Sequence, residues 1–357
     1  MTTPREGYST GTCAAAAAKA AAMVLCGQAV PQTIDVALPD GTRAALAVLS
    51  AKTCGDSAEA AVRKDAGDDP DVTDGKTIIA RVRWTDGNEI AFAAGEGVGT
   101  VTRPGLSVPP GEPAINPVPR AMIRQAVREV TGRGLHVTLS IPGGREIAEK
   151  TFNPRLGIVG GLSILGTTGR VRPFSHPALQ AALKCGIDVA VACAINAPVL
   201  VPGHIGERSA RRHFELRPEQ VVEVSNEWGF MLDLAARAPF EHILIVGHPG
   251  KLAKLAEGEW DTHSSRSINA VAPVMTLAQN VLGREIAETP TVEGLFDALG
   301  LDERRLVANA LAERIRRRVE DFVQAIEKRA RGTAVVLINM QTEWLGSSGE
   351  LSAWRRK

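Results

Sequence analysis

The first part of the chain alternates apolar and polar residues in short segments. Four such segments stand out, at residues 33–38, 43–49, 77–84 and 89–93. Alternation with a period of two is typical of strands that are buried on one face only. Asp-Gly pairs at 40–41 and 86–87 favour tight hairpin turns between these segments. The pattern therefore predicts a mixed or antiparallel sheet.

Two helices are expected beside this sheet. Residues 12–26 are rich in alanine, begin in a Ser/Thr-rich stretch that can cap a helix, and end before a glycine. A second helix is expected at about 120–131, followed by a strand at 135–141. The stretch 95–119 between them is rich in glycine and proline, and such a long loop is either functional or a linker. We therefore expect an N-terminal α+β domain over residues 1–147.

From residue 148 onward, apolar runs alternate with stretches of helical character. The runs lie at residues 187–194, 221–224, 243–246 and 334–338. Alternation of strands and helices is the signature of a mostly parallel sheet that helices cover. This pattern predicts a C-terminal, Rossmann-like α/β domain over residues 148–357, so the chain combines α+β and α/β architecture in two domains.

Polar and glycine residues follow several of these apolar runs. They include Ser225, Asn226, Gly247 and Gly250. Because ligands of open α/β sheets bind at the carboxyl ends of the strands, we expect these residues to line one crevice. The segment Gly166, Thr167, Thr168, Gly169 could join them, since its glycines let backbone approach a ligand. It matches neither G-x-G-x-x-G nor a Walker loop, so simple turns remain the alternative.

Two histidines and one acid are the candidate catalytic groups. His248 lies at the carboxyl end of an apolar run, and Asp261 and His263 follow a short helical stretch. A histidine held by a neighbouring carboxylate is suited to moving protons. The alternative is that Asp261 caps a following helix at about 264–282 and His263 packs beside it. No H-x-x-x-H spacing supports a metal site, and none is expected.

Several arginines fall in loops beside the glycine segments. We single out Arg103, Arg155, Arg170 and Arg172. A guanidinium binds carboxylate through two parallel hydrogen bonds, so converging arginines would suit a substrate with several carboxylates. We expect these four across a cleft between the domains, although most surface arginines only face solvent.

Composition narrows the function classes. The 357 residues include 41 basic and 40 acidic ones, so the net charge of +1 indicates neither a nucleic-acid nor a membrane partner. Five cysteines without C-x-x-C spacing favour a reducing, cytoplasmic location. The alanine-rich run 14–22 is too short and too weakly apolar to span a bilayer or act as a targeting segment. A homo-oligomer stays open.

Four stretches together resemble the CbiD family, the cobalt-precorrin-5B C1-methyltransferases of the oxygen-independent cobalamin pathway. They are "GYSTGTCAAAAAKAA", "GEGVGTVTRPGLSVPPGEPAINPVPR", "TFNPRLGIVGGLSILGTTGRVRPFS" and "VGHPGKLAKLAEGEWDTHS". The set is far more specific than any one of its glycine motifs. The resemblance implies a soluble enzyme that moves the methyl group of S-adenosylmethionine to C1 of a ring-contracted cobalt-corrin precursor, giving cobalt-precorrin-6A.

Taken together with this resemblance, the residue pattern predicts roles for the crevice and the arginines. The crevice would hold S-adenosylmethionine, the arginines would bind the carboxylates of the tetrapyrrole, and cobalt would arrive within the substrate. Two other functions stay open: a nucleotide-dependent transferase or reductase on the same sheet, and a non-catalytic carrier that binds a corrinoid without an adenosyl pocket.

Overall fold

The computed structural model describes residues 4–173 and 175–357. Phe174, within the third of the stretches that resemble the CbiD family, lies outside the described residues. The chain forms two compact units, Met1–His176 and Pro177–Lys357. The sequence pattern puts the division earlier, between 147 and 148. Residues 158–159 and 170–171 pair with strands of the first unit, which explains the later division.

The first unit contains a six-stranded sheet. Its order is β2 (Thr33–Ala37), β3 (Arg43–Cys54), β4 (Ser57–Arg63), β5 (Thr77–Trp84), β8 (Leu135–Ser140) and β6 (Ile90–Ala94). All neighbours are antiparallel except β6 and β8, so the expected mixed sheet is confirmed. Strand β4 escaped sequence analysis because its "SAEAAVR" is rich in alanine, which strands disfavour.

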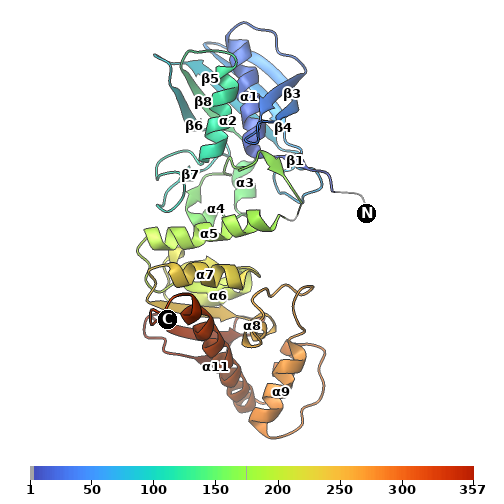
Figure 1. Cartoon of the computed structure of the whole chain (residues 1–357), viewed down its shortest axis with the longest axis vertical. Coiled ribbons are helices and arrows are strands. Elements are labelled where there is room, and N and C mark those ends of the chain that lie inside the picture. Colours follow the sequence, from blue (N-terminus) through green and yellow to red (C-terminus); the bar gives the residue numbers. More distant parts are fainter. Residues whose placement is uncertain (1–3, 174) are drawn as a thin grey trace. The chain divides into compact units, whose positions relative to one another are not determined.

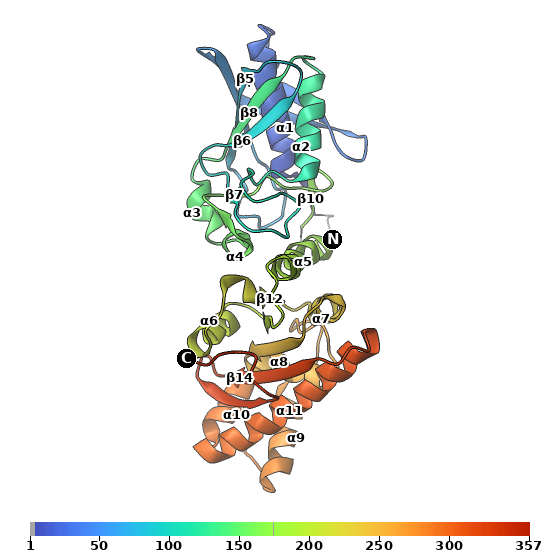
Figure 2. The same ribbon diagram turned by 90° about the vertical axis from the view of Figure 1, so that its left-hand side faces the viewer.

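Two helices, α1 (Thr10–Leu25) and α2 (Pro117–Arg128), lie side by side against this sheet (Figures 1 and 2). Both helices are confirmed, with α2 starting three residues before the expected position. The alanines of α1 are fully buried, and their small side chains let the helix approach the strands closely. The Ser9 hydroxyl caps α1 by accepting a hydrogen bond from the Thr12 N–H at 3.2 Å.

The segments that link these elements are ordered. Strand β7 (Thr100–Val101) pairs with β9 (Ile158–Val159), and β1 (Gly7–Tyr8) pairs with β10 (Arg170–Val171). Two short helices, α3 (Gly144–Ala148) and α4 (Asn153–Leu156), lie between β8 and β9. The Gly/Pro-rich stretch 95–119 is therefore part of the first unit's fold rather than a free linker.

The second unit contains a five-stranded sheet. Its order is β12 (Val221–Glu223), β11 (Val199–Val201), β13 (His242–Gly247), β14 (Gly332–Ile338) and β15 (Trp344–Ser348). The first four strands are parallel and β15 is antiparallel. The strand expected at 187–194 is wrong, because these residues end helix α5 (His176–Ala192). A short apolar run can belong to a buried helix as well as to a strand.

Helices cover both faces of the second sheet (Figure 2). On one face lies α6 (His204–His213). Ala210 of this helix and its C-cap residue Phe214 pack against every second side chain of β11, β13 and β14. On the other face, α11 (Leu301–Ile326) lies along β14 and β15 and contacts α7 (Trp228–Arg237) and α8 (Pro249–Ala256). This three-layer arrangement places α6, which follows β11, and α8, which follows β13, on opposite faces of the sheet.

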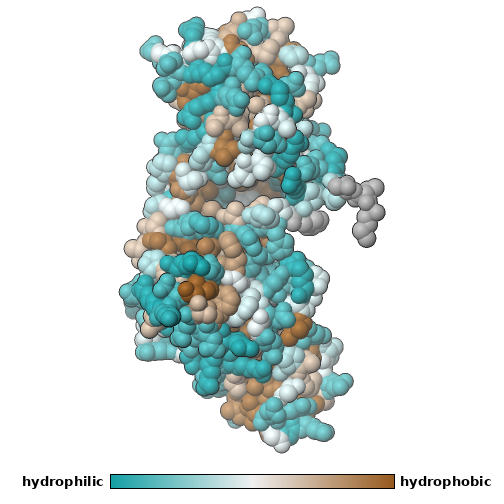
Figure 3. Space-filling view, in the orientation of Figure 1, coloured by the Kyte–Doolittle hydropathy of each residue, from teal (hydrophilic) through white to brown (hydrophobic). Residues whose placement is uncertain are grey.

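Two further helices, α9 (Val271–Leu282) and α10 (Val292–Ala298), lie between α8 and α11 in sequence. The helix expected from about 264 starts only at Val271, since residues 261–270 form turns. In the face shown in Figure 3, polar residues dominate and apolar residues form separate groups, one of them over α9. Only two residues of α9 are buried, so it adds little to the core.

Candidate functional site

The carboxyl edge of the second sheet has the strand topology at which open α/β sheets bind ligands. Strands β11 and β13 are adjacent and parallel, and the helices that follow them, α6 and α8, leave on opposite faces. In open α/β sheets such a reversal creates a crevice between the two loops, and ligands bind there. Here the loops are Pro202–Gly203 after β11 and the single residue His248 after β13.

A glycine and an acid that sequence analysis missed lie at this edge. Gly203 adopts φ 153° and ψ −161°, a region open essentially to glycine. A Cβ on Gly203 would meet only the Oε1 atom of Glu223, at 3.9 Å, so the space beside this backbone is open. Glu223 ends β12, 20 residues after Gly203. An acid at this spacing after a glycine turn is a dinucleotide-site signal that could have revealed the pair.

Lys251 supplies a positive charge close to Glu223. Burial lowers the pKa of the Lys251 ammonium, and the negative charge of Glu223 partly offsets this effect. Lys251 lies in the first turn of α8, directly after the loop that follows β13. The edge therefore carries a carboxylate and an ammonium that are close enough to interact.

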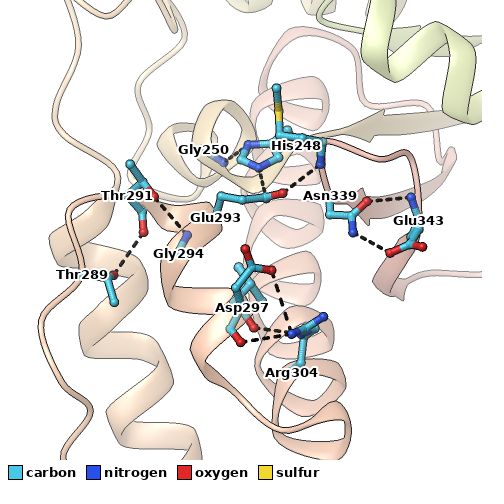
Figure 4. Close-up of polar contacts among 12 residues, drawn as sticks. His248, Gly250, Thr289, Thr291, Glu293, Gly294, Asp297, Arg304, Asn339 and Glu343 are labelled. Carbon is cyan, nitrogen blue, oxygen red and sulfur yellow. Dashed lines mark hydrogen bonds and ion pairs between the residues drawn. The ribbon is translucent and has the colours of Figure 1, made fainter.

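The ring of His248 is held from both sides (Figure 4). Its Nδ1 atom accepts the N–H of Gly250 at 3.0 Å, which makes His248 the N-cap of α8. Its Nε2 atom therefore carries the proton and donates to Glu293 of α10 at 2.6 Å. The other oxygen of Glu293 accepts the N–H of Met340, after β14, at 3.1 Å. His248 thus joins β13, α10 and β14 and has no free lone pair.

The Asp261 carboxylate does not hold the His263 ring. Its Oδ1 accepts the backbone N–H of His263 at 2.9 Å, and its Oδ2 accepts from Arg266 at 2.6 Å. The Nδ1 atom of His263 instead lies 2.8 Å from the Ser265 hydroxyl. Asp261 does not cap α9 either, because that helix begins only at Val271. His248 and Glu293 form a histidine–carboxylate pair of this unit, and their separation of 45 positions concealed it in the sequence.

The loop after β12 meets the turn that contains Asp261 and His263. Ser225 adopts φ 54°, which is uncommon for a residue other than glycine and marks local strain. The carbonyl of Asn226 accepts the N–H of Thr262 at 3.1 Å. The buried ammonium of Lys254, in α8, donates to the Thr262 carbonyl at 3.2 Å and holds the turn at residues 261–263 in place. Ser225, Asn226 and residues 261–263 are therefore brought together.

The segment Gly166–Gly169 lies in the first unit, whereas the other candidate cofactor residues lie in the second. A Cβ on Gly166 would approach the Ser9 hydroxyl to 2.3 Å. The Gly169 carbonyl accepts the Ser9 N–H at 2.9 Å and the Thr12 hydroxyl at 2.6 Å. The close approach that these glycines allow is to the start of α1, as in the structural alternative for this segment.

The four candidate arginines all lie in the first unit and form two pairs. Arg103 donates to the Arg155 carbonyl at 2.8 Å, and Arg155 lies over the Phe152 ring. Arg172 donates to Glu6 at 2.7 Å, and Arg170 lies 4.0 Å from the same carboxylate. The second pair is therefore already neutralised in part by an acid of the same unit.

Comparisons with known proteins identify the family. A CbiD profile matches residues 1–173. A Syntrophotalea carbinolica protein named cobalt-precorrin-5B C(1)-methyltransferase is 55% identical over 98% of both chains. The chain belongs to the CbiD family. A Klebsiella pneumoniae CbiD relative of the same name is 41% identical over 99% of this chain and 95% of its own.

A solved CbiD structure is also similar to this chain. It is the cobalamin biosynthesis protein from Archaeoglobus fulgidus, which is 29% identical over 74% of this chain and 83% of its own, with a TM-score of 0.39. Within the described part of this CbiD chain, no helix is long and apolar enough to cross a membrane. Over the same residues, no group of three or more His, Cys, Asp or Glu could hold a metal ion.

Proposed function

We propose that this chain is a cobalt-precorrin-5B C(1)-methyltransferase of cobalamin biosynthesis. One observation carries the proposal: a relative of that name is 55% identical over 98% of both chains. The reaction adds a methyl group to C1 of the corrin precursor and gives cobalt-precorrin-6A. Cobalt belongs to the substrate, so the chain needs no metal ligands of its own for this role.

The proposed methyl donor is S-adenosylmethionine, which supplies an already activated methyl group when bound. No nucleophilic side chain is then required. The protein has to hold the sulfur, the methyl group and the acceptor carbon in line and to exclude water. Loops held at the edge of a sheet suit this task better than a flexible segment.

The proposed donor site is the crevice between the loops after β11 and β13. Gly203 leaves room beside its backbone, and Glu223 can accept hydrogen bonds from ribose hydroxyls, as acids at this position of Rossmann-like sheets do. Lys251 lies at the same edge and suits the donor's carboxylate. These residues fit an adenosyl group with a charged amino-acid tail.

Some of the cofactor-binding residues expected from the sequence belong to the proposed donor site. Ser225 and Asn226 follow Glu223 directly, and Gly247 and Gly250 flank His248. A Cβ on Gly247 would press on Pro202 at 3.0 Å, so this glycine serves the packing of the two loops. We leave Gly166, Thr167, Thr168 and Gly169 out of the proposed site, because the close contacts of its glycines are to Ser9 and Thr12.

The candidate catalytic residues divide into one reacting group and two positioning residues. The Nε2 atom of His263 makes no hydrogen bond to the residues that the structure describes, so this atom can exchange a proton with the substrate. Asp261 shapes the turn through the His263 N–H and Arg266. Both ring nitrogens of His248 are engaged, which leaves it to hold the loop after β13.

Arg103, Arg155, Arg170 and Arg172 are the proposed contacts of the substrate carboxylates. Arg103 and Arg155 support each other through the hydrogen bond from guanidinium to carbonyl. Arg170 and Arg172 would have to exchange Glu6 for a substrate carboxylate.

Ligand-induced stabilisation tests the function. The melting temperature of the purified chain should rise with S-adenosylhomocysteine and not with ATP or NADPH, because only a ligand of the native state stabilises it. Conversion of cobalt-precorrin-5B should then add one methyl group, measured by mass spectrometry. Stabilisation by ATP or NADPH alone would favour a nucleotide-dependent enzyme. Corrinoid binding without any effect of S-adenosylhomocysteine would favour a carrier.

A further inference from the structure

The first unit has a pocket that none of the residues above accounts for. Its volume is about 270 Å³. Its lining consists of Ser107, Val108, Pro109, Pro117, Arg120 and Arg124. One side comes from the Gly/Pro-rich stretch and the other from the first two turns of α2. The pocket thus brings two arginines to a wall of small and apolar residues.

The wall of the pocket is rigid, because the Gly/Pro-rich stretch is held at both ends. The Val101 N–H donates to the Glu112 carbonyl at 3.0 Å, and the Asn116 N–H donates to the Ile164 carbonyl at 3.0 Å. Val108 is 3% exposed and packs in a small apolar cluster with Val101, Ala114 and Ile158. A long ordered loop with its own core is typical of a binding element rather than of a linker.

Phe92 of β6 positions both arginines. The guanidinium carbons of Arg120 and Arg124 lie 5.5 Å and 5.0 Å from the centre of its ring. Arg120 also donates to the carbonyls of Ile115 and Pro113, which fixes it to the loop. Stacking on an aromatic ring reduces the freedom of a guanidinium and leaves its N–H edge available for an anion.

The charge of this region is not balanced within α2. Arg120, Arg124 and Arg128 recur every four residues, on one face of the helix, and the helix contains no acid. Glu112 pairs with Arg120 at 3.2 Å, whereas Arg124 forms no ion pair with the residues that the structure describes. An anion in the pocket would therefore meet a guanidinium that has no competing carboxylate.

We propose that this pocket is a carboxylate site in which Arg124, supported by Arg120, binds an acid group of a ligand. The inference rests on the proposed function, which offers two sources of that group: the acetate or propionate side chains of the tetrapyrrole or, were it held here rather than at Lys251, the amino-acid carboxylate of the methyl donor. Planar, bidentate binding suits either source. None of Arg103, Arg155, Arg170 and Arg172 lines this pocket.

Calorimetric titration of three probes tests the proposal. They are dicyanocobyrinic acid, which has free peripheral carboxylates, dicyanocobinamide, in which these groups are amides, and S-adenosylhomocysteine. Arg124→Gln should weaken binding of the carboxylate-bearing probe by about tenfold or more, as for a lost charge-assisted hydrogen bond. The affinity of Arg124→Lys should lie between those of the wild type and Arg124→Gln, because lysine keeps the charge but cannot form two parallel hydrogen bonds.

Arg133→Gln is the matched control. Arg133 is also exposed and stacked on a ring, 3.9 Å from the centre of Trp84, but does not line the pocket. A loss limited to dicyanocobyrinic acid assigns the site to the tetrapyrrole, and a loss limited to S-adenosylhomocysteine assigns it to the donor. Unchanged affinities in Arg124→Gln, or equal losses in Arg133→Gln, overturn the proposal. Binding of dicyanocobyrinic acid without methyl transfer to cobalt-precorrin-5B would instead refute the proposed function alone.

Discussion

Replacing Glu293 should loosen the carboxyl edge of the second sheet. Its two oxygens accept from the His248 ring at 2.6 Å and from the Met340 N–H at 3.1 Å. Glu293→Ala removes both acceptors, which tie α10 to the loops after β13 and β14 (Figure 4). Glu293→Gln keeps one acceptor oxygen and should lose about half as much.

The size of the effect follows from the two bonds. The side chains of His248 and Glu293 are 18% and 22% exposed, so water replaces the lost partners only in part. At about 1 kcal/mol for each bond, Glu293→Ala should lose about 2 kcal/mol of unfolding free energy. For a unit of this size, that loss lowers the melting temperature by about 4–8 °C.

Thermal unfolding followed by circular dichroism measures this loss on the full chain. Glu288→Ala is the control, because Glu288 precedes α10, is exposed and carries the same charge. The affinity for S-adenosylhomocysteine should also fall in Glu293→Ala, since His248 no longer fixes the loop beside Gly250. Melting temperatures within about 1 °C of the wild type in both Glu293 variants would refute the reasoning.

Three further outcomes are expected. Glu223→Gln should weaken S-adenosylhomocysteine binding by about tenfold, because a neutral amide accepts hydroxyl groups less strongly, and calorimetry showing equal affinity would exclude the ribose role. His263→Ala should slow methyl transfer by about a hundredfold at unchanged donor affinity, whereas Asp261→Asn, which keeps Oδ1, should slow it less; normal turnover in His263→Ala would leave the residue structural. Hydrogen bonding from Arg43 lowers the pKa of Glu129 from 4.5 to about 2, so its stabilisation is complete above pH 4.5 and lost as the pH falls towards 2. Unfolding free energy should therefore decline less steeply over this window in Glu129→Gln, and parallel pH curves would contradict the assignment.

The local pattern of apolar and polar residues predicted those strands and helices in which that pattern is regular. The strand at Thr77–Trp84 alternates apolar and polar residues from Ala80 to Trp84, and its predicted bounds are confirmed. The strand at His242–Gly247 was found within one residue, since its continuous apolar run suits a strand that is buried on both faces. The run at 187–194 misled the prediction because its length and composition also fit the buried end of a helix.

The candidate site was predicted only in outline. The strand ends carry Ser225, Asn226 and His248 at one edge because parallel strands end on the same side, which the sequence order implies. The partner of His248 was not foreseen, since Glu293 reaches the ring from a helix 45 positions later. The side chain of Asp261 was assigned to the wrong neighbour for the same reason: sequence proximity does not determine which donor a carboxylate meets.

The sequence by itself determined the family, the alternation of strands and helices, and the clusters of glycine and arginine, because these depend on residue type and spacing along one chain. Tertiary structure decided which loops meet. It set Gly203 beside Glu223, packed Gly166 against Ser9, and stacked Arg124 on Phe92. These contacts depend on strand order and helix packing, which many residues determine jointly, so no single motif could predict them.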